Sequence, residues 1–90
     1  MKIMAICGSG LGSSFMVEMN IKKVLKKLDI EADVEHSDLS SATPGAADLF
    51  VMAKDIAASA SVPESQLVVI NNIIDINELE AQLRGWFERQ

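Results

Sequence analysis

The sequence IMAICGSGLGSSF, residues 3–15, joins an apolar run to a glycine-rich turn and indicates where the chemistry lies. An apolar run ends in Cys7, the only cysteine of the chain, and three glycines and three serines follow within seven residues. A continuous apolar run is typical of a strand buried on both faces, so residues 2–7 are predicted to form one. A glycine-rich turn from such a strand into a helix is a poor place to pack a thiol and a suitable place to bind an anion.

Strand and helix patterns alternate along the rest of the chain. Residues 31–36 alternate in polarity and are expected to form an edge strand, whereas 48–53 and 67–70 are apolar and are expected to be central. Residues 14–28 are predicted to form a helix, with Glu18 early and lysines late, as the helix dipole favours. Its apolar positions recur at helical spacing: Val17, Ile21, Val24, Leu25 and Leu28.

Weaker signals fill the remainder of the chain. Residues 37–47 are predicted to form the longest loop, and 54–61 a short helix or turn that ends before Pro63. The sequence DINE, residues 75–78, is typical of a capping box with Asp75 as the N-cap. The helix that follows is expected to present one apolar face, and Trp86 is expected to pack in the core or against a helix. That face comprises Ile76, Leu79, Leu83 and Phe87.

This element order predicts an α/β fold, a small three-layer domain spanning residues 1–90. Its four-stranded, mainly parallel sheet has the order 2-1-3-4, with helices on both faces. Ligands of such sheets bind at the carboxyl ends of the strands, where the strand order reverses. That point lies between the first and third strands, and the first strand ends at Cys7.

Composition excludes several classes of function. Thirteen acidic residues against eight basic ones argue against a nucleic-acid partner. No apolar run is long enough to cross or insert into a membrane, no signal peptide is evident, and one cysteine cannot form an intrachain disulfide, so a cytoplasmic location is expected. The one basic cluster is either a solvated helix flank or a docking surface for an acidic partner. It comprises Lys22, Lys23, Lys26 and Lys27.

The glycine spacing excludes the familiar nucleotide-binding loops. Gly8, Gly10 and Gly12 form G-x-G-x-G, in which the third glycine falls one residue short of the dinucleotide fingerprint. No lysine stands between Lys2 and Lys22, so a Walker A loop is absent, and Gly10 replaces the second cysteine of a redox C-x-x-C pair.

A cysteine-headed phosphate loop remains. Backbone N–H groups of a glycine-rich turn and a helix N-terminus converge on an anion, and the same field favours the thiolate of Cys7. Hydroxyl groups add donors, and Ser13 or Ser14 can also cap the helix. The predicted site therefore has Cys7 as nucleophile and a phosphate-binding set comprising Gly8, Ser9, Gly10, Leu11, Gly12, Ser13 and Ser14.

Three other interpretations of the loop stay open. Cys7 could simply be a buried strand residue, or the loop could be an anion sensor without chemistry. A cysteine-dependent phosphatase or arsenate-reductase-like enzyme would use C-x-x-x-x-x-R, and Ser13 stands where that arginine is needed. The only arginines, Arg84 and Arg89, lie near the C-terminus, so a loop that holds a phosphocysteine is favoured over one that hydrolyses it.

The segment CGSGLGSS, residues 7–14, resembles the phosphorylation loop of IIB components of the bacterial sugar phosphotransferase system. The ascorbate type is most similar, the mannitol-type loop is also similar, and the serine- and alanine-richer loops of lactose- and chitobiose-type proteins are less so. The resemblance implies that Cys7 accepts a phosphoryl group from a phosphohistidine of a IIA protein. Cys7 would then pass the group to a sugar, ascorbate-like by this resemblance, held by the membrane IIC component.

Few residues outside the loop suggest further chemistry. His36, the only histidine, is expected to end the exposed edge strand, and with one histidine and one cysteine no metal site is expected. No cofactor is expected either. Phe15, Met16 and Met19 follow the loop and lie partly off the core face of the helix. Either they belong to the core, or they form a surface on which adaptable side chains dock partner proteins. No acid or base is evident near the loop in sequence.

Overall fold

The computed structural model describes residues 1–7, 13–38, 40, 42–72 and 75–89. The elements in chain order are β1 (Lys2–Cys7), α1 (Ser13–Lys27), β2 (Asp33–Asp38), β3 (Leu49–Ala53), α2 (Lys54–Ala57), the short 3-10 helix η2 (Glu64–Gln66), β4 (Leu67–Ile70) and α3 (Ile76–Glu88).

The four strands form one sheet in the order β2-β1-β3-β4, which confirms the predicted order. All three strand pairs are parallel, so the described sheet is parallel throughout. Ile3 of β1 pairs with Val34 on one side and with Leu49 on the other. The four carboxyl ends therefore meet at one edge of the sheet.

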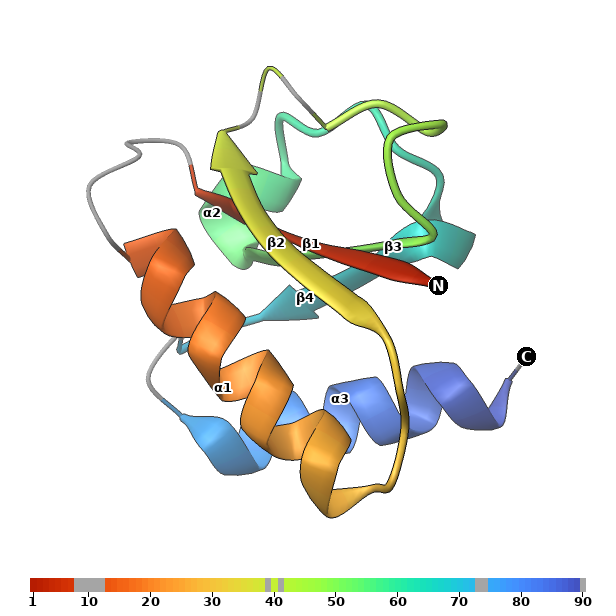
Figure 1. Ribbon diagram of the computed structural model, residues 1–90. Coiled ribbons are helices and arrows are strands. Elements are labelled where there is room, and N and C mark those ends of the chain that lie inside the picture. The colour runs from red at the N-terminus through yellow and green to blue at the C-terminus, as the bar shows by residue number, and fades with distance from the viewer. Residues whose placement is uncertain (8–12, 39, 41, 73–74, 90) are drawn as a thin grey trace.

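Helices cover both faces of the sheet, as predicted. Figure 1 shows α1 and α3 together on one side and α2 on the other. On the first side Ile3, Ile21 and Leu83 belong to the larger apolar core, and on the second Phe50 and Met52 belong to a smaller one. Residues of β1 alternate between these two cores, which explains why its apolar run is continuous.

The predicted boundaries of α1 are each wrong by one residue, since the helix spans Ser13–Lys27 rather than 14–28. Its core face is confirmed: Leu28 packs partly buried against the core, and the other four predicted positions are buried. The helix ends because Asp29 adopts a positive φ of 58°. The N–H of Ile30 then donates to the carbonyl of Leu25 at 2.9 Å, which closes a Schellman motif.

The edge strand begins two residues later than predicted, at Asp33 rather than at residue 31, and continues to Asp38. Its alternation identified a strand but not the ends, which depend on pairing: Lys2 pairs with Asp33 and Cys7 with Asp38. The loop before β3 is accordingly shorter than residues 37–47.

At α3 the predicted cap is confirmed and the apolar face is partly wrong. The Asp75 carboxylate accepts hydrogen bonds from the N–H groups of Asn77 and Glu78, at 3.0 and 3.1 Å. The Glu78 carboxylate does not complete the capping box but accepts from Asn71 and Asn72. Ile76 is exposed, whereas Trp86 continues the stripe of Leu79 and Leu83, and its indole N–H donates to the Ser65 carbonyl at 2.8 Å.

Candidate functional site

The candidate site lies where β1 ends and α1 begins. β1 has β2 on one side and β3 on the other, so the strand order reverses beside it. β1 ends at Cys7, whose backbone pairs with Asp38 at the end of β2, and α1 begins at Ser13. The structure thus confirms the predicted topology that brings Cys7 to the switch point of the sheet.

Much of the predicted phosphate loop lies outside the described residues. This holds for Gly8, Ser9, Gly10, Leu11 and Gly12 and for the side chains of Cys7, Ser13 and Ser14. Their assignment as nucleophile and phosphate-binding residues therefore stays a prediction.

A buried acidic group lies one turn into α1. Glu18 is only 7% exposed, and it is the one buried charged residue among those the structure describes. Its carboxylate contacts His36 Nδ1 on β2 through one oxygen and Lys22 Nζ, at 2.8 Å, through the other. Glu18 therefore ties the first helix to the edge strand.

These contacts determine the charge of Glu18. Burial alone would raise the pKa of this carboxyl, but the hydrogen bonds from Lys22 and His36 outweigh burial, and the pKa is lowered. Glu18 is thus an ionised carboxylate at neutral pH, held between two basic side chains.

The contact between Glu18 and His36 was missed by sequence reasoning. The four-residue spacing of Glu18 and Lys22 is a recognisable helical ion-pair signal. His36, by contrast, is eighteen residues away and meets Glu18 only through the fold. His36 does not end β2 as predicted, since the strand continues to Asp38, and it is paired rather than simply exposed.

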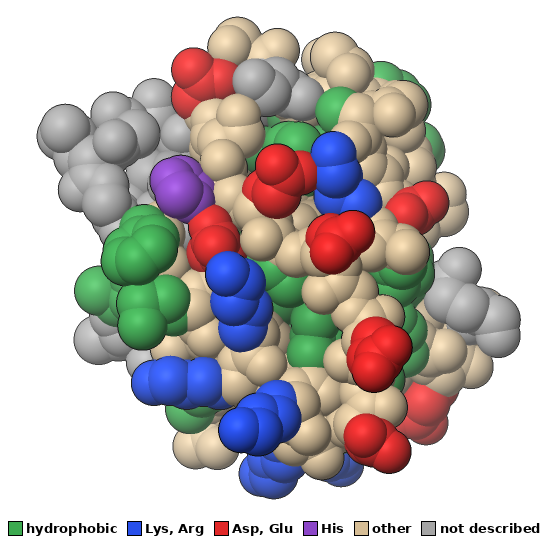
Figure 2. All heavy atoms as spheres, viewed as in Figure 1, with side chains coloured by type: hydrophobic (Ala, Val, Ile, Leu, Met, Phe, Trp, Pro, Cys, Tyr) green, Lys and Arg blue, Asp and Glu red, His purple; other side chains and the backbone are tan. Residues whose placement is uncertain are grey.

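The three residues expected to dock partners are exposed on the first turns of α1. Phe15, Met16 and Met19 are 51%, 44% and 44% exposed. The Phe15 ring meets the His36 ring edge-on, with centroids 5.7 Å apart. In Figure 2 a group of apolar side chains accordingly lies beside the histidine.

The lysine cluster of α1 is divided by the fold. Lys22 pairs with Glu18, and Lys27 pairs with Glu80 of α3 at 2.9 Å. Lys23 and Lys26 are exposed and form no ion pair within the part of the chain that the structure describes. Two of the four lysines thus form ion pairs within the chain, and the other two present their charge to solvent.

Within residues 1–7, 13–38, 40, 42–72 and 75–89, no three His, Cys, Asp or Glu residues are grouped so that they could hold a metal ion. The helices among these residues are too short or too polar to cross a bilayer.

The described strands form a parallel four-stranded α/β domain whose first strand ends with Cys7 at the switch point. The family model described as the lactose/cellobiose-specific IIB subunit of the phosphotransferase system matches residues 2–84. The chain therefore belongs to this family of phosphotransferase IIB subunits, which implies phosphotransferase activity in general.

A curated relative comes from a second subclass. The chain is 27% identical over 85 residues to the ascorbate-specific EIIB component of Mycoplasma pneumoniae, covering 90% of this chain and 88% of the relative. This relative is of the ascorbate type, which the segment CGSGLGSS resembles most, while the family model bears the lactose/cellobiose description.

Two solved structures share the fold. The lactose-specific IIB domain of Streptococcus pneumoniae has a TM-score of 0.63 at 16% identity, covering 98% of this chain and 95% of that one. A low-molecular-weight protein tyrosine phosphatase of Bacillus subtilis has a TM-score of 0.58 at 18% identity, covering 100% and 99%. At these identities the likeness concerns the fold alone.

Proposed function

We propose that this chain is the cytoplasmic phosphoryl carrier of a sugar phosphotransferase transport system. Cys7 accepts a phosphoryl group from a phosphohistidine of a IIA protein and passes it to an ascorbate-like sugar held by the membrane IIC component. IIC recruits the carrier to the inner face of the membrane. The proposal is supported chiefly by the position of Cys7 at the end of β1, at the switch point of a fold that belongs to the IIB family.

The proposed chemistry consists of two displacements at phosphorus. In the first, the Cys7 thiolate forms an S–P bond while the N–P bond of the donor breaks, and the released imidazole takes up a proton. In the second, a sugar hydroxyl forms an O–P bond, the S–P bond breaks to restore the thiolate, and the hydroxyl proton passes to a base outside this chain. Backbone N–H groups from Gly8 to Ser14 and the N-terminus of α1 would hold the phosphoryl oxygens.

Hydrolysis is the competing function, because a tyrosine phosphatase shares the fold. A cysteine-dependent phosphatase needs an arginine six residues after its cysteine to grip the phosphoryl oxygens, and this chain has Ser13 there. Arg84 and Arg89 both belong to the last two turns of α3 and its C-cap, remote in sequence from the loop. The carrier function is therefore favoured.

The proposal is tested by incubation with a phosphorylated IIA protein of an ascorbate-type system. The chain should gain one phosphoryl group, and the bond should be cleaved by iodine, as expected for a thiophosphate. Cys7→Ser should accept almost none, because a serine hydroxyl without a base is a far weaker nucleophile.

A relocated thiol provides the matched control. Ser61 is exposed on a different part of the chain, so Cys7→Ser combined with Ser61→Cys restores a thiol without restoring its position. This double variant should remain inactive. Phosphorylation of the wild-type chain on His36 or on a loop serine would overturn the proposal.

A further inference from the structure

We infer that α1 carries a docking strip for the soluble phosphodonor, half apolar and half basic, and that the membrane component binds elsewhere. The strip comprises Phe15, Met16, Met19, Lys23 and Lys26. This inference rests on the proposed function, because it names which of the two proposed partners uses this face.

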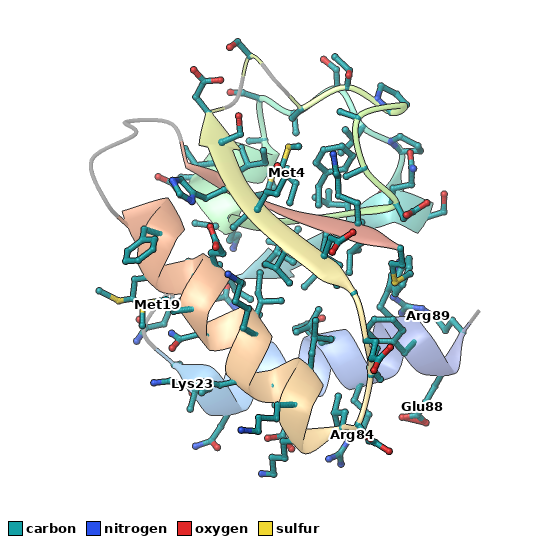
Figure 3. All side chains as sticks on the ribbon, viewed as in Figure 1. Met4, Met19, Lys23, Arg84, Glu88 and Arg89 are labelled. Carbon is teal, nitrogen blue, oxygen red and sulfur yellow. The ribbon has the colours of Figure 1, made fainter. Side chains whose placement is uncertain are left out.

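The five residues of the strip share one side of the helix. Met16, Met19, Lys23 and Lys26 are separated by three, four and three residues, which keeps them on one face of a helix with 3.6 residues per turn, and Phe15 lies beside Met19. Figure 3 shows Met19 and Lys23 projecting from the same side of α1. The core positions, such as Ile21 and Val24, face the opposite direction.

The apolar half of the strip exposes more than folding requires. Five large apolar side chains are exposed among the described residues, and three of them are Phe15, Met16 and Met19. The Phe15 ring is braced by the edge-on contact with His36, which Glu18 holds in turn. An exposed aromatic ring that is already held in place is a good anchor, since binding orders it at little entropic cost.

The basic half determines which partner fits. Lys23 and Lys26 have no ion pair within the described ranges, whereas the chain as a whole carries a net charge of −5. A partner whose apolar patch is bordered by Asp and Glu would be attracted to this strip, while the net negative charge of the chain would disfavour its binding elsewhere. Cytoplasmic loops of membrane proteins instead carry an excess of Lys and Arg. The charge therefore selects the soluble donor over the membrane component.

Binding of an unphosphorylated ascorbate-type IIA protein, measured by titration calorimetry, tests the strip without requiring any chemistry. Lys23→Glu and Lys26→Glu should each weaken binding by about fivefold at low salt, and the loss should largely vanish in about 1 M salt, where charges are screened beyond about 3 Å. Met19→Ser should weaken binding about tenfold at both salt concentrations, because it removes apolar contact.

Arg89→Glu is the matched charge reversal. Arg89 is an exposed residue at the end of α3, and Figure 3 shows it on the opposite side of the molecule from Lys23. It should leave binding unchanged. Equal effects of Lys23→Glu and Arg89→Glu would show that only net charge matters, and no effect of Lys23→Glu would equally overturn the inference.

Transfer assays distinguish the partners and separate this inference from the proposed function. Lys23→Glu should raise the donor KM for phosphorylation of Cys7 and leave kcat unchanged, and discharge to sugar in vesicles that contain a IIC protein should match wild type. Slower discharge with normal acceptance, or self-association of the chain that Met19→Ser abolishes, would assign the strip to another occupant. Failure of the proposed function would appear differently, as a wild-type chain that binds the donor and gains no phosphoryl group.

Discussion

Glu18 is the residue whose surroundings differ most from what its sequence position suggests. An acidic residue early in a helix is ordinarily a surface residue that complements the helix dipole. Here it is buried and joins Lys22 on its own helix to His36 on the neighbouring strand. Because His36 also contacts the Phe15 ring, Glu18 indirectly positions this one exposed apolar side chain.

Replacement of Glu18 by Gln should lower the free energy of unfolding by about 1–3 kcal/mol at pH 7, because a buried charged hydrogen-bond network loses its acceptor. The folded state lowers the pKa of Glu18, so folding favours the ionised carboxylate. Its contribution to stability is full above the ordinary glutamate range and is lost as the pH falls through and below it. The difference between wild type and variant should therefore shrink in acid.

Urea unfolding of both proteins between pH 7 and pH 3 measures this difference. Glu88→Gln is the control, since Glu88 is exposed and forms no ion pair in the described part of α3 and its surroundings. It should leave the stability unchanged at every pH. A difference between wild type and Glu18→Gln that is constant across the pH range would refute the role of ionised Glu18.

The position of a single residue could be predicted where the order of the strands and helices along the chain is enough to determine it. Cys7 was correctly expected to end the first strand, because its apolar run continues up to the glycine loop. The pairing of Glu18 with His36 could not be predicted, because it depends on the rotation of α1 over β2. The roles of Cys7 and of the loop residues remain predictions.

The end of α1 shows how one backbone angle terminates an element. Asp29 has a φ of 58°, a conformation that is strained for residues with a Cβ atom. The Asp29 N–H donates to Lys26 at 3.2 Å and the Ile30 N–H to Leu25 at 2.9 Å, so the Schellman bonds maintain this angle. The acidic side chain is also unfavourable there, because a helix C-terminus carries partial negative charge.

Asp29→Gly should therefore raise the free energy of unfolding by about 0.5–1 kcal/mol, since the strain relieved exceeds the entropy that glycine loses. Asp29→Ala also removes the unfavourable charge but keeps the strain, so it should gain less than Asp29→Gly. Thermal and urea unfolding of both variants would reveal the contrast. Equal stability of the two variants would mean that the backbone angle is not strained.

Elements were predictable in type and less so at their ends. β4 was predicted to its exact bounds, because turn residues flank a short apolar run. The predicted bounds of β2 differ from the observed ones by two residues, because pairing with β1 determines where an alternating strand starts. On α3, Trp86 rather than Ile76 joined Leu79 and Leu83, a choice made by the sheet beneath the helix.

The topology of the whole molecule follows from the order of its strands and helices along the chain. Alternation of strands and helices predicted the parallel sheet and its order, because right-handed connections leave few alternatives. The switch point then follows from topology and needs no knowledge of side chains. The transported sugar does not follow, because selectivity for it would reside mainly in the membrane partner.

The fold is shared with a tyrosine phosphatase. The proposed carrier would differ from a hydrolase in keeping the phosphoryl group on Cys7 until a sugar accepts it. The most direct measurement is the fate of a radiolabelled phosphoryl group on the purified chain. After removal of the IIA donor, the label should stay on Cys7 in buffer and leave rapidly once IIC vesicles and sugar are added, appearing as sugar phosphate. Rapid release of inorganic phosphate in buffer alone, with no need for IIC or sugar, would contradict the carrier function.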